Sequence, residues 1–96
     1  MSRREPFRFR LYVAGDAPNS TQAVANLNAL CRMHLPDRHL IEIVDVFREP
    51  KRALADSIFM TPTLIKLAPS PVRRIVGTLS QVRPVLLALG LEGVAA

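Results

Sequence analysis

The spacing of apolar residues in the first half of the chain switches between the periods of a strand and of a helix. Residues 7–13 place apolar side chains at every second position, which predicts a strand with one buried face. After a Gly-Asp-Ala-Pro-Asn turn, apolar residues recur every three or four positions as far as Leu35. This spacing predicts a helix capped by Asn19 or Ser20. Residues 40–47 are almost continuously apolar and predict a second strand, central in its sheet and largely buried.

A short helix, two strands and a last helix are expected in the second half. Pro50 suits the first turn of the short helix, whose apolar side would consist of Leu54, Ala55 and Ile58. Residues 63–67 and 72–76 predict two strands, and the Pro-Ser-Pro turn between them is short enough for an antiparallel hairpin. The last helix would begin at Ser80, with an apolar side formed by Val82, Val85, Leu86 and Leu89. Within it, Pro84 is expected to cost an early hydrogen bond.

The resulting order is βαβαββα, an α/β arrangement of thioredoxin-like type. The first two strands are joined by a helix, so we expect them to be parallel with a right-handed crossover. The 96 residues form a single domain, residues 1–96, with flexible ends at 1–6 and 92–96. No apolar run is long enough to cross a bilayer, and no signal peptide is visible. With only one cysteine, the chain is expected to be cytoplasmic.

The net charge of +5 indicates an anionic partner, and arginine supplies eleven of the thirteen positive charges. The arginines are spread along the chain, without the exposed aromatic residues or the motif that nucleic-acid binding would require. Neither nucleic acid nor a membrane is therefore the expected partner. An acidic protein surface remains as the expected kind of partner, although guanidinium groups bind both carboxylates and phosphates in bidentate geometry.

Catalytic and metal sites are poorly supported. A thioredoxin-like domain would carry its redox pair in the loop after the first strand, and residues 15–20 contain no cysteine. Cys31 falls on the apolar side of the first helix, where an inert, buried thiol is expected. His34, Asp37 and His39 lie near one turn, but their spacing matches no metal motif. The sequence therefore favours a binding protein without metal or cofactor over an enzyme.

The basic residues Lys66, Arg73 and Arg74 are the most distinctive charged group. If the last two strands pair, these side chains could share one end or one face of the hairpin. They would then either protect an edge strand from aggregation or bind a partner. Spacing alone favours edge protection.

Several ordered blocks resemble a known family. The first contains Leu11-Tyr12-Val13-Ala14-Gly15 and Pro18-Asn19-Ser20, and Ile43-Val44-Asp45-Val46 and Pro50 follow it. The most specific block contains Thr61-Pro62-Thr63-Leu64, Pro71-Val72-Arg73-Arg74-Ile75-Val76-Gly77 and Leu79-Ser80. In this order, over about residues 7–91, they resemble the KaiB family of bacterial circadian-clock proteins.

The resemblance implies a non-enzymatic regulator that binds the N-terminal ATPase ring of a KaiC-type protein. Where those partners exist, such proteins also help to capture KaiA or displace a clock histidine kinase. The KaiC-facing basic residues of the family correspond to Lys66, Arg73 and Arg74. With this resemblance, partner binding becomes the favoured role of the three residues.

The resemblance also implies two folds for one chain. Relatives rest as a βαββααβ form, usually a homo-tetramer, and a rare thioredoxin-like monomer is the form that binds, so a tetramer or dimer is expected at rest. Candidate switch positions are Pro62, Pro69, Pro71, Gly77, Ala88 and Gly90. The family often has glycine where this chain has Ala88, and alanine favours a continuous last helix. We therefore expect the thioredoxin-like form to be more populated here than in typical relatives.

A second interpretation is a thioredoxin-like sensor or adaptor domain related to the input domain of a clock histidine kinase. Such a domain normally continues into a helical linker and a kinase core. This chain ends instead, which favours the stand-alone regulator.

Overall fold

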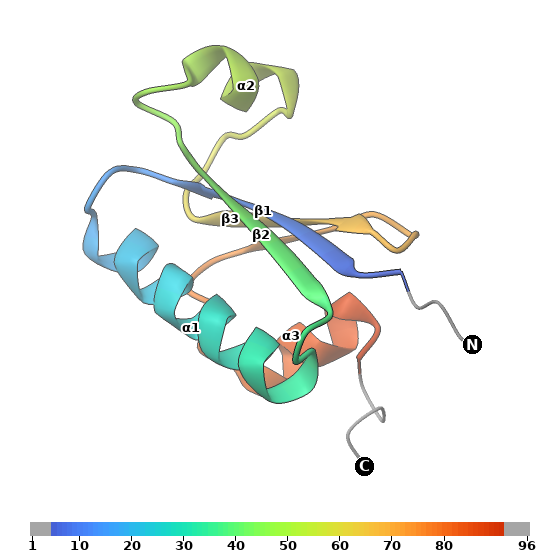
Figure 1. Cartoon of the computed structure of the whole chain (residues 1–96). Coiled ribbons are helices and arrows are strands. Elements are labelled where there is room, and N and C mark those ends of the chain that lie inside the picture. Colours follow the sequence, from blue (N-terminus) through green and yellow to red (C-terminus); the bar gives the residue numbers. More distant parts are fainter. Residues whose placement is uncertain (1–4, 92–96) are drawn as a thin grey trace.

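The computed structural model describes residues 5–91, and Figure 1 shows how its helices and strands are arranged. Their order is β1 (Phe7–Val13), α1 (Pro18–His34), β2 (His39–Asp45), α2 (Pro50–Ala55), β3 (Thr63–Ala68), β4 (Arg73–Val76) and α3 (Val82–Leu89). The predicted βαβαββα order is confirmed. Apart from residues 5 and 6, which are exposed, the ends that were expected to be flexible lie outside the described residues.

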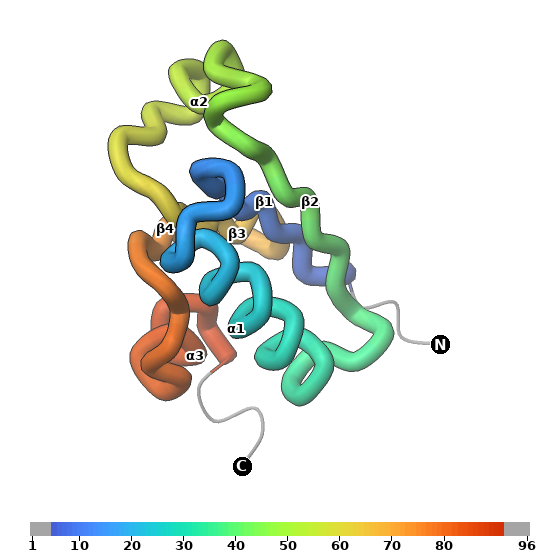
Figure 2. The backbone as a smooth tube through the Cα atoms, turned by 90° about the vertical axis from the view of Figure 1, so that its left-hand side faces the viewer, coloured from blue at the N-terminus to red at the C-terminus, as the bar shows by residue number. Residues whose placement is uncertain are grey.

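The four strands form one sheet in the order β2-β1-β3-β4. β1 and β2 are parallel, as expected for strands joined by a helix, whereas β1 and β3, and β3 and β4, are antiparallel. The predicted hairpin of β3 and β4 is therefore confirmed. Figures 1 and 2 show α1 and α3 against one face of the sheet and α2 on the opposite side.

β1 separates two apolar clusters, because successive side chains of a strand point to opposite faces. Its alternate residues belong to the larger cluster, between the sheet and helices α1 and α3: Phe7, Phe9, Leu11 and Val13. The helix stripe that the sequence predicted supplies Ala23, Leu27, Leu30 and Cys31 to the same cluster. Tyr12 points the other way and packs with Val44, Ala53 and Ile65. Within residues 5–91, no helix is long and apolar enough to cross a membrane.

The prediction that the second strand is central and buried is wrong. β2 is an edge strand, because β1 pairs with β2 on one side and with β3 on the other. Leu40 is 57% exposed and Ile43 is 44% exposed. The continuous apolar run of β2 therefore does not mean that both faces of this strand are buried.

The ends of the helices also differ from the predictions. α1 begins at Pro18, and its N-cap residue is Ala17, which has no side-chain acceptor, so the predicted cap by Asn19 or Ser20 is wrong. The Ser20 hydroxyl accepts the Ala14 N–H instead. α3 begins at Val82, two residues later than expected. Pro84 therefore lies in the first turn, where backbone N–H groups have no partner inside the helix, and it costs no helical hydrogen bond.

The apolar side predicted for α2 is partly wrong. Leu54 is 76% exposed, whereas Ala53 is buried against the sheet. Ile58 does pack against the smaller cluster, but from beyond the end of the helix. α2 has only six residues, so it covers only part of its face of the sheet.

Candidate partner-binding surface

The hairpin of β3 and β4 carries the three basic residues that the sequence singled out. In its register Lys66 lies opposite Arg73, and Arg74 lies opposite Ile65. Because adjacent residues of a strand point to opposite faces, Arg74 does not share the face of Lys66 and Arg73. The three residues therefore share the turn end of the hairpin, as one expectation had it, but not one face.

Lys66 is buried beneath the C-terminal end of α3. Lys66 is only 4% exposed, and its Nζ donates a hydrogen bond of 3.3 Å to the carbonyl oxygen of Leu89. The same Nζ lies 5.7 Å from the centre of the Phe7 ring. The last carbonyls of a helix have no partner inside it, so the ammonium group caps α3. Burial, with the nearby charge of Arg73, lowers the pKa of Lys66.

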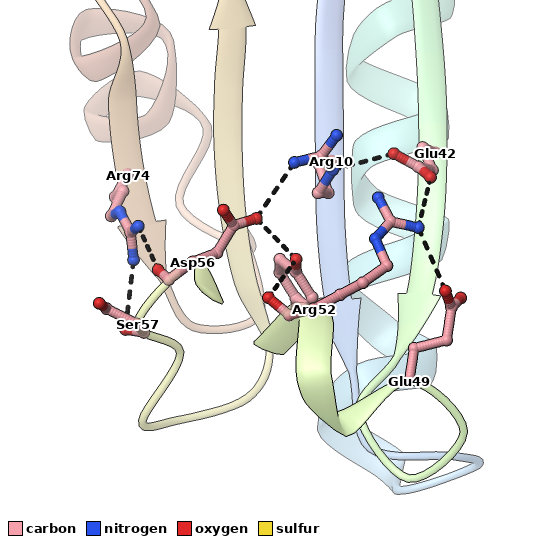
Figure 3. Close-up of polar contacts among 8 residues, drawn as sticks. Arg10, Glu42, Glu49, Arg52, Asp56, Ser57 and Arg74 are labelled. Carbon is pink, nitrogen blue, oxygen red and sulfur yellow. Dashed lines mark hydrogen bonds and ion pairs between the residues drawn. The ribbon is translucent and has the colours of Figure 1, made fainter. Parts of the chain in front are cut away.

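Arg74 fixes the segment that follows α2 (Figure 3). Its guanidinium donates to the backbone carbonyl oxygens of Asp56 and Ser57, the latter at 3.4 Å. Both acceptors are neutral carbonyls, but the charge of Arg74 also contributes to the lowered pKa of the nearby Asp56 carboxyl group. Arg73 and Arg74 are both exposed on the edge strand β4, where charged side chains also oppose edge-to-edge aggregation.

An ion-pair network crosses the α2 side of the sheet beside Arg74 (Figure 3). Arg10 of β1 pairs with Glu42 of β2 at 2.9 Å and with Asp56 at 3.1 Å. Arg52 of α2 pairs with Glu42 at 2.8 Å and with Glu49 at 3.4 Å. The network therefore connects the short helix to both strands beneath it.

Tyr12 adds a buried hydroxyl to this network. The residue is fully buried, and its hydroxyl donates to Asp56 Oδ2 at 2.6 Å, with the Arg52 carbonyl oxygen also in reach at 3.1 Å. The bonds from Tyr12 and Arg10 lower the pKa of Asp56. Hydrogen bonds from Arg52 and Arg10 lower the pKa of Glu42 to about 2. Both carboxylates therefore stay ionised at neutral pH.

Three large apolar side chains are exposed where β1 and β2 end and β3 begins. Phe47 is 75% exposed, Phe59 is 88% exposed and Met60 is 62% exposed. We call these three residues the apolar rim. Phe47 follows β2, and the other two lie between α2 and β3. The rim therefore joins two loops that are distant in sequence.

Two grooves meet along the rim. One, of about 220 Å³, lies between Phe47 and the 58–60 segment and has Ala14 in its wall. The other, of about 340 Å³, lies on the far side of the 58–60 segment and has Val76 and Arg74 in its wall. The 58–60 segment is therefore a ridge between two largely apolar grooves.

The loop after β1 is where a thioredoxin-like enzyme would carry its redox pair, and in this chain it contains no cysteine. Its contacts are structural. The Asp45 carboxylate accepts the N–H groups of Gly15 at 3.2 Å and Phe47 at 2.9 Å, and so ties this loop to the end of β2. Cys31 lies elsewhere, fully buried on α1, and burial raises the pKa of its thiol to about 11. A protonated, inaccessible thiol is a poor nucleophile.

The two histidines lie at the end of α1 and the start of β2. His39 Nδ1 lies 2.7 Å from the Leu35 carbonyl oxygen, a contact that links the ends of the helix–strand connection. Asp37 has a positive φ of 59° in the turn between them. The part of the chain that the structure describes contains no group of three or more His, Cys, Asp or Glu side chains that could hold a metal ion.

The candidate switch positions run from the residue just before β3 to the residue just after α3: Pro62, Pro69, Pro71, Gly77, Ala88 and Gly90. All three prolines follow cis peptide bonds. Gly90 has a left-handed φ of 79° and ends α3, with its N–H bonded to the Leu87 carbonyl at 3.1 Å. The next residue, Leu91, is buried and donates to the Leu86 carbonyl at 2.8 Å. α3 is thus capped by its own chain and by Lys66.

Sequence reasoning missed both the ion-pair network and the apolar rim. The network joins residues 32 and 46 positions apart, which no local pattern reveals. A signal for the rim was present, because Phe59 and Met60 are apolar residues outside every predicted strand and helix.

Comparisons with known proteins identify the family. A family model, the KaiB domain, matches residues 10–91. The circadian clock protein KaiB3 of Synechocystis is 44% identical over 82 residues, which cover 85% of this chain and 80% of that protein. The circadian clock oscillator protein KaiB of Prochlorococcus marinus is 42% identical over 91 residues, covering 95% of this chain and 76% of that protein.

Solved structures with low sequence identity share the fold. The N-terminal domain of Synechococcus elongatus SasA has a TM-score of 0.72 at 18% identity, covering 97% of this chain and 91% of that chain. Chloroplastic thioredoxin z has a TM-score of 0.73 at 18% identity, covering 93% of this chain and 80% of that chain. These likenesses show a thioredoxin-like fold alone. The family model and the relatives above 40% identity show that this chain belongs to the KaiB family.

Proposed function

We propose that this chain is a non-enzymatic timing regulator that binds the N-terminal ATPase ring of a KaiC-type protein. The observation that carries the proposal is the KaiB-domain match over residues 10–91. The buried, protonated Cys31 adds support, since thiol chemistry needs an accessible thiolate. In this proposal residues 1–96 act as one domain in the cytoplasm, without a cofactor, a nucleic acid or a membrane.

The basic residues of the hairpin would meet acidic groups of the ring. Arg73 and Arg74 are exposed, so both are available to a partner in the described conformation. Lys66 is not, because its ammonium group is bonded to the Leu89 carbonyl beneath α3. We therefore expect Arg73 and Arg74 to contact the ring first, and Lys66 to contribute only when the end of α3 moves.

We further propose that the described fold is the binding state and that the chain rests as a βαββααβ tetramer or dimer. The rearranging part would contain the candidate switch positions: Pro62, Pro69, Pro71, Gly77, Ala88 and Gly90. Two such folds must differ by only a few kcal/mol, roughly 1–5. The apparent affinity for the ring then falls with the fraction of chain in the binding state.

A second candidate function is a sensor or adaptor that works with a clock histidine kinase. It is compatible with the fold that this chain shares with the N-terminal domain of SasA, with 97% of this chain covered. In this version the chain competes with the kinase for a shared partner. KaiA, where it exists, would be a further partner of either version.

The experiment measures mass by light scattering on a sizing column. The chain is run alone, then after long incubation with ATP and the KaiC-type protein of the same organism. An oligomer that slowly becomes a complex with the ring would support the proposal, and the isolated C-terminal ring is the control that should not bind. A chain that never joins the ring would contradict it. A chain that associates with the kinase input domain and not with the ring would favour the second candidate.

A further inference from the structure

The two edges of the sheet differ in how they are protected. β4 has only four residues and carries Arg73 and Arg74, whereas β2 has seven residues and contains no proline or lysine. β2 pairs with β1 without a bulge, and its Leu40 and Ile43 are 57% and 44% exposed. In Figure 2 the outer side of β2 is free of the described helices, which lie on the two faces of the sheet. A long, apolar edge of this kind is open to pairing with a further strand.

The backbone of β2 has a free row of hydrogen-bonding groups. The Val46 N–H donates to the Val13 carbonyl at 2.9 Å, and the Arg38 carbonyl accepts the Phe7 N–H at 2.8 Å. Positions 38 and 46 therefore face β1, and so do the even-numbered positions between them, because alternate residues of a strand point their N–H and C=O groups to opposite sides. The backbone groups that point away from β1 are those of the odd-numbered residues: His39, Ile41, Ile43 and Asp45.

The two ends of β2 are complementary to each other. His39 begins the strand and Asp45 ends it, and both side chains lie on the α1 face, opposite Phe7 and Val13 of β1. The Nδ1 atom of His39 contacts the Leu35 carbonyl, and the bonds of Asp45 to the loop use its Oδ1 atom. Each side chain thus keeps a second polar atom for another contact. The imidazole ring carries a positive charge in mildly acidic solution, so an antiparallel copy of β2 would place opposite charges together at both ends.

The middle of β2 does not oppose such pairing. In the register that sets His39 opposite Asp45, Glu42 lies opposite its own copy, and like charges at opposite positions are destabilising. However, both carboxylate oxygens of Glu42 already have partners (Figure 3). Oε1 is paired with Arg10 at 2.9 Å and Oε2 with Arg52 at 2.8 Å. Each carboxylate is therefore neutralised within its own chain before two copies meet.

We propose that two copies of this chain pair through β2, antiparallel and with Glu42 on the two-fold axis, to form one continuous sheet. Ile41 of each copy then exchanges both backbone hydrogen bonds with Ile43 of the other. Leu40 lies opposite Val44 of the other copy, which covers part of its exposed surface. The dimer keeps the described fold and is therefore separate from the proposed βαββααβ resting form. The interface consists mainly of one strand from each copy, so we expect a weak dimer with a Kd of roughly 10–100 µM.

The first test traps the register as a disulfide. Under mild oxidation, Glu42→Cys places two thiols on the axis, where opposite Cα atoms are about 4.5 Å apart. The control Ile43→Cys places its two thiols on diagonal positions, about 7–8 Å apart, which is too far for an unstrained disulfide. We expect Glu42→Cys to cross-link at least about tenfold faster. The unmodified chain should not cross-link, because its only cysteine, Cys31, is buried. Circular dichroism establishes that the variants are folded.

The second test measures the mass of the free chain by sedimentation equilibrium from about 5 to 500 µM at about pH 6. Ile43→Lys adds a charge to the middle of β2, and Val76→Lys adds the same charge to β4, where Val76 is 54% exposed. Lysine on an edge strand opposes pairing with a further strand. We expect Ile43→Lys to weaken the dimer at least about tenfold, and Val76→Lys to change its Kd by less than about twofold.

Three results would overturn the proposal. A chain whose mass does not rise with concentration forms no such dimer. A dimer that Ile43→Lys weakens no more than Val76→Lys does is held by a surface other than β2. Cross-linking that is faster for Ile43→Cys than for Glu42→Cys would move the axis to Ile43 and remove the match of His39 with Asp45. Neither test contains the ring, so the proposed function would stand after any of these results.

Discussion

Replacing Tyr12 by phenylalanine removes a single oxygen atom from the junction of β1 and α2. The residue is fully buried, and its hydroxyl donates to Asp56 Oδ2 at 2.6 Å. A hydrogen bond to a charged acceptor stabilises a fold by about 1.5–3 kcal/mol. The Asp56 side chain is 28% exposed and keeps its bond from Arg10. Water and Arg10 therefore compensate in part, and we expect Tyr12→Phe to lower the free energy of unfolding by about 1.5 kcal/mol.

Urea unfolding followed by circular dichroism measures this loss. For a domain of this size it corresponds to a fall of about 6–12 °C in Tm, at an unchanged m-value. The matched control is Thr78→Val, because the Thr78 hydroxyl donates to the Ser80 hydroxyl at an exposed site. The control should change stability by less than about 0.5 kcal/mol. A Tyr12→Phe protein as stable as the original would show that this hydrogen bond does not stabilise the fold. An equal loss in an Asp56→Ala background, where the bond to Asp56 is absent, would show that the loss has another origin.

Three further changes test the electrostatics, the core and the end of α3. Hydrogen bonds from Arg52 and Arg10 hold the pKa of Glu42 in the folded chain at about 2, against an ordinary value of 4.5. The ionised Glu42 carboxylate therefore stabilises the folded chain fully at pH values above 4.5. This stabilisation is lost as the pH falls from about 4.5 toward 2, and Glu42→Gln should flatten the plot of urea midpoint against pH in that window. A thiol reagent at about pH 8 should label Cys31 only after unfolding, because the thiol is buried with a pKa of about 11; rapid labelling of the folded chain would contradict this. Gly90→Ala should lower the free energy of unfolding by about 1–2 kcal/mol, because Gly90 has a φ of 79°; an unchanged Tm would show that the cap does not matter.

The order of the helices and strands and the core face of β1 could be predicted because both depend on local periodicity. Alternation along residues 7–13 and the three-to-four spacing of the first helix each identify a buried face without knowledge of the partner strands. The hairpin was predictable for a similar reason, since a short proline-containing turn leaves two adjacent strands few ways to pair.

The place of each strand in the sheet could not be predicted in this way. The apolar run of 40–47 favoured a central strand, but β3 pairs with the other side of β1 and leaves β2 at the edge. The position of Arg74 relative to Lys66 likewise depends on the β3–β4 register. The contacts of Asp56 with Arg10 and Tyr12 span 46 and 44 positions and arise only when α2 folds over the sheet. These features depend on long-range pairing, which one sequence does not encode in any local pattern.

The most direct test is hydrogen–deuterium exchange, measured on the chain alone and on its complex with the ATP-loaded KaiC-type ring. We predict that the amides of β3 and β4 that are hydrogen-bonded in the antiparallel hairpin are protected in the complex and exchange more slowly there than in the free chain. If adding the ring changes the exchange of no segment, the chain does not bind it. If β3 and β4 exchange freely in the complex, the described fold is not the one that binds.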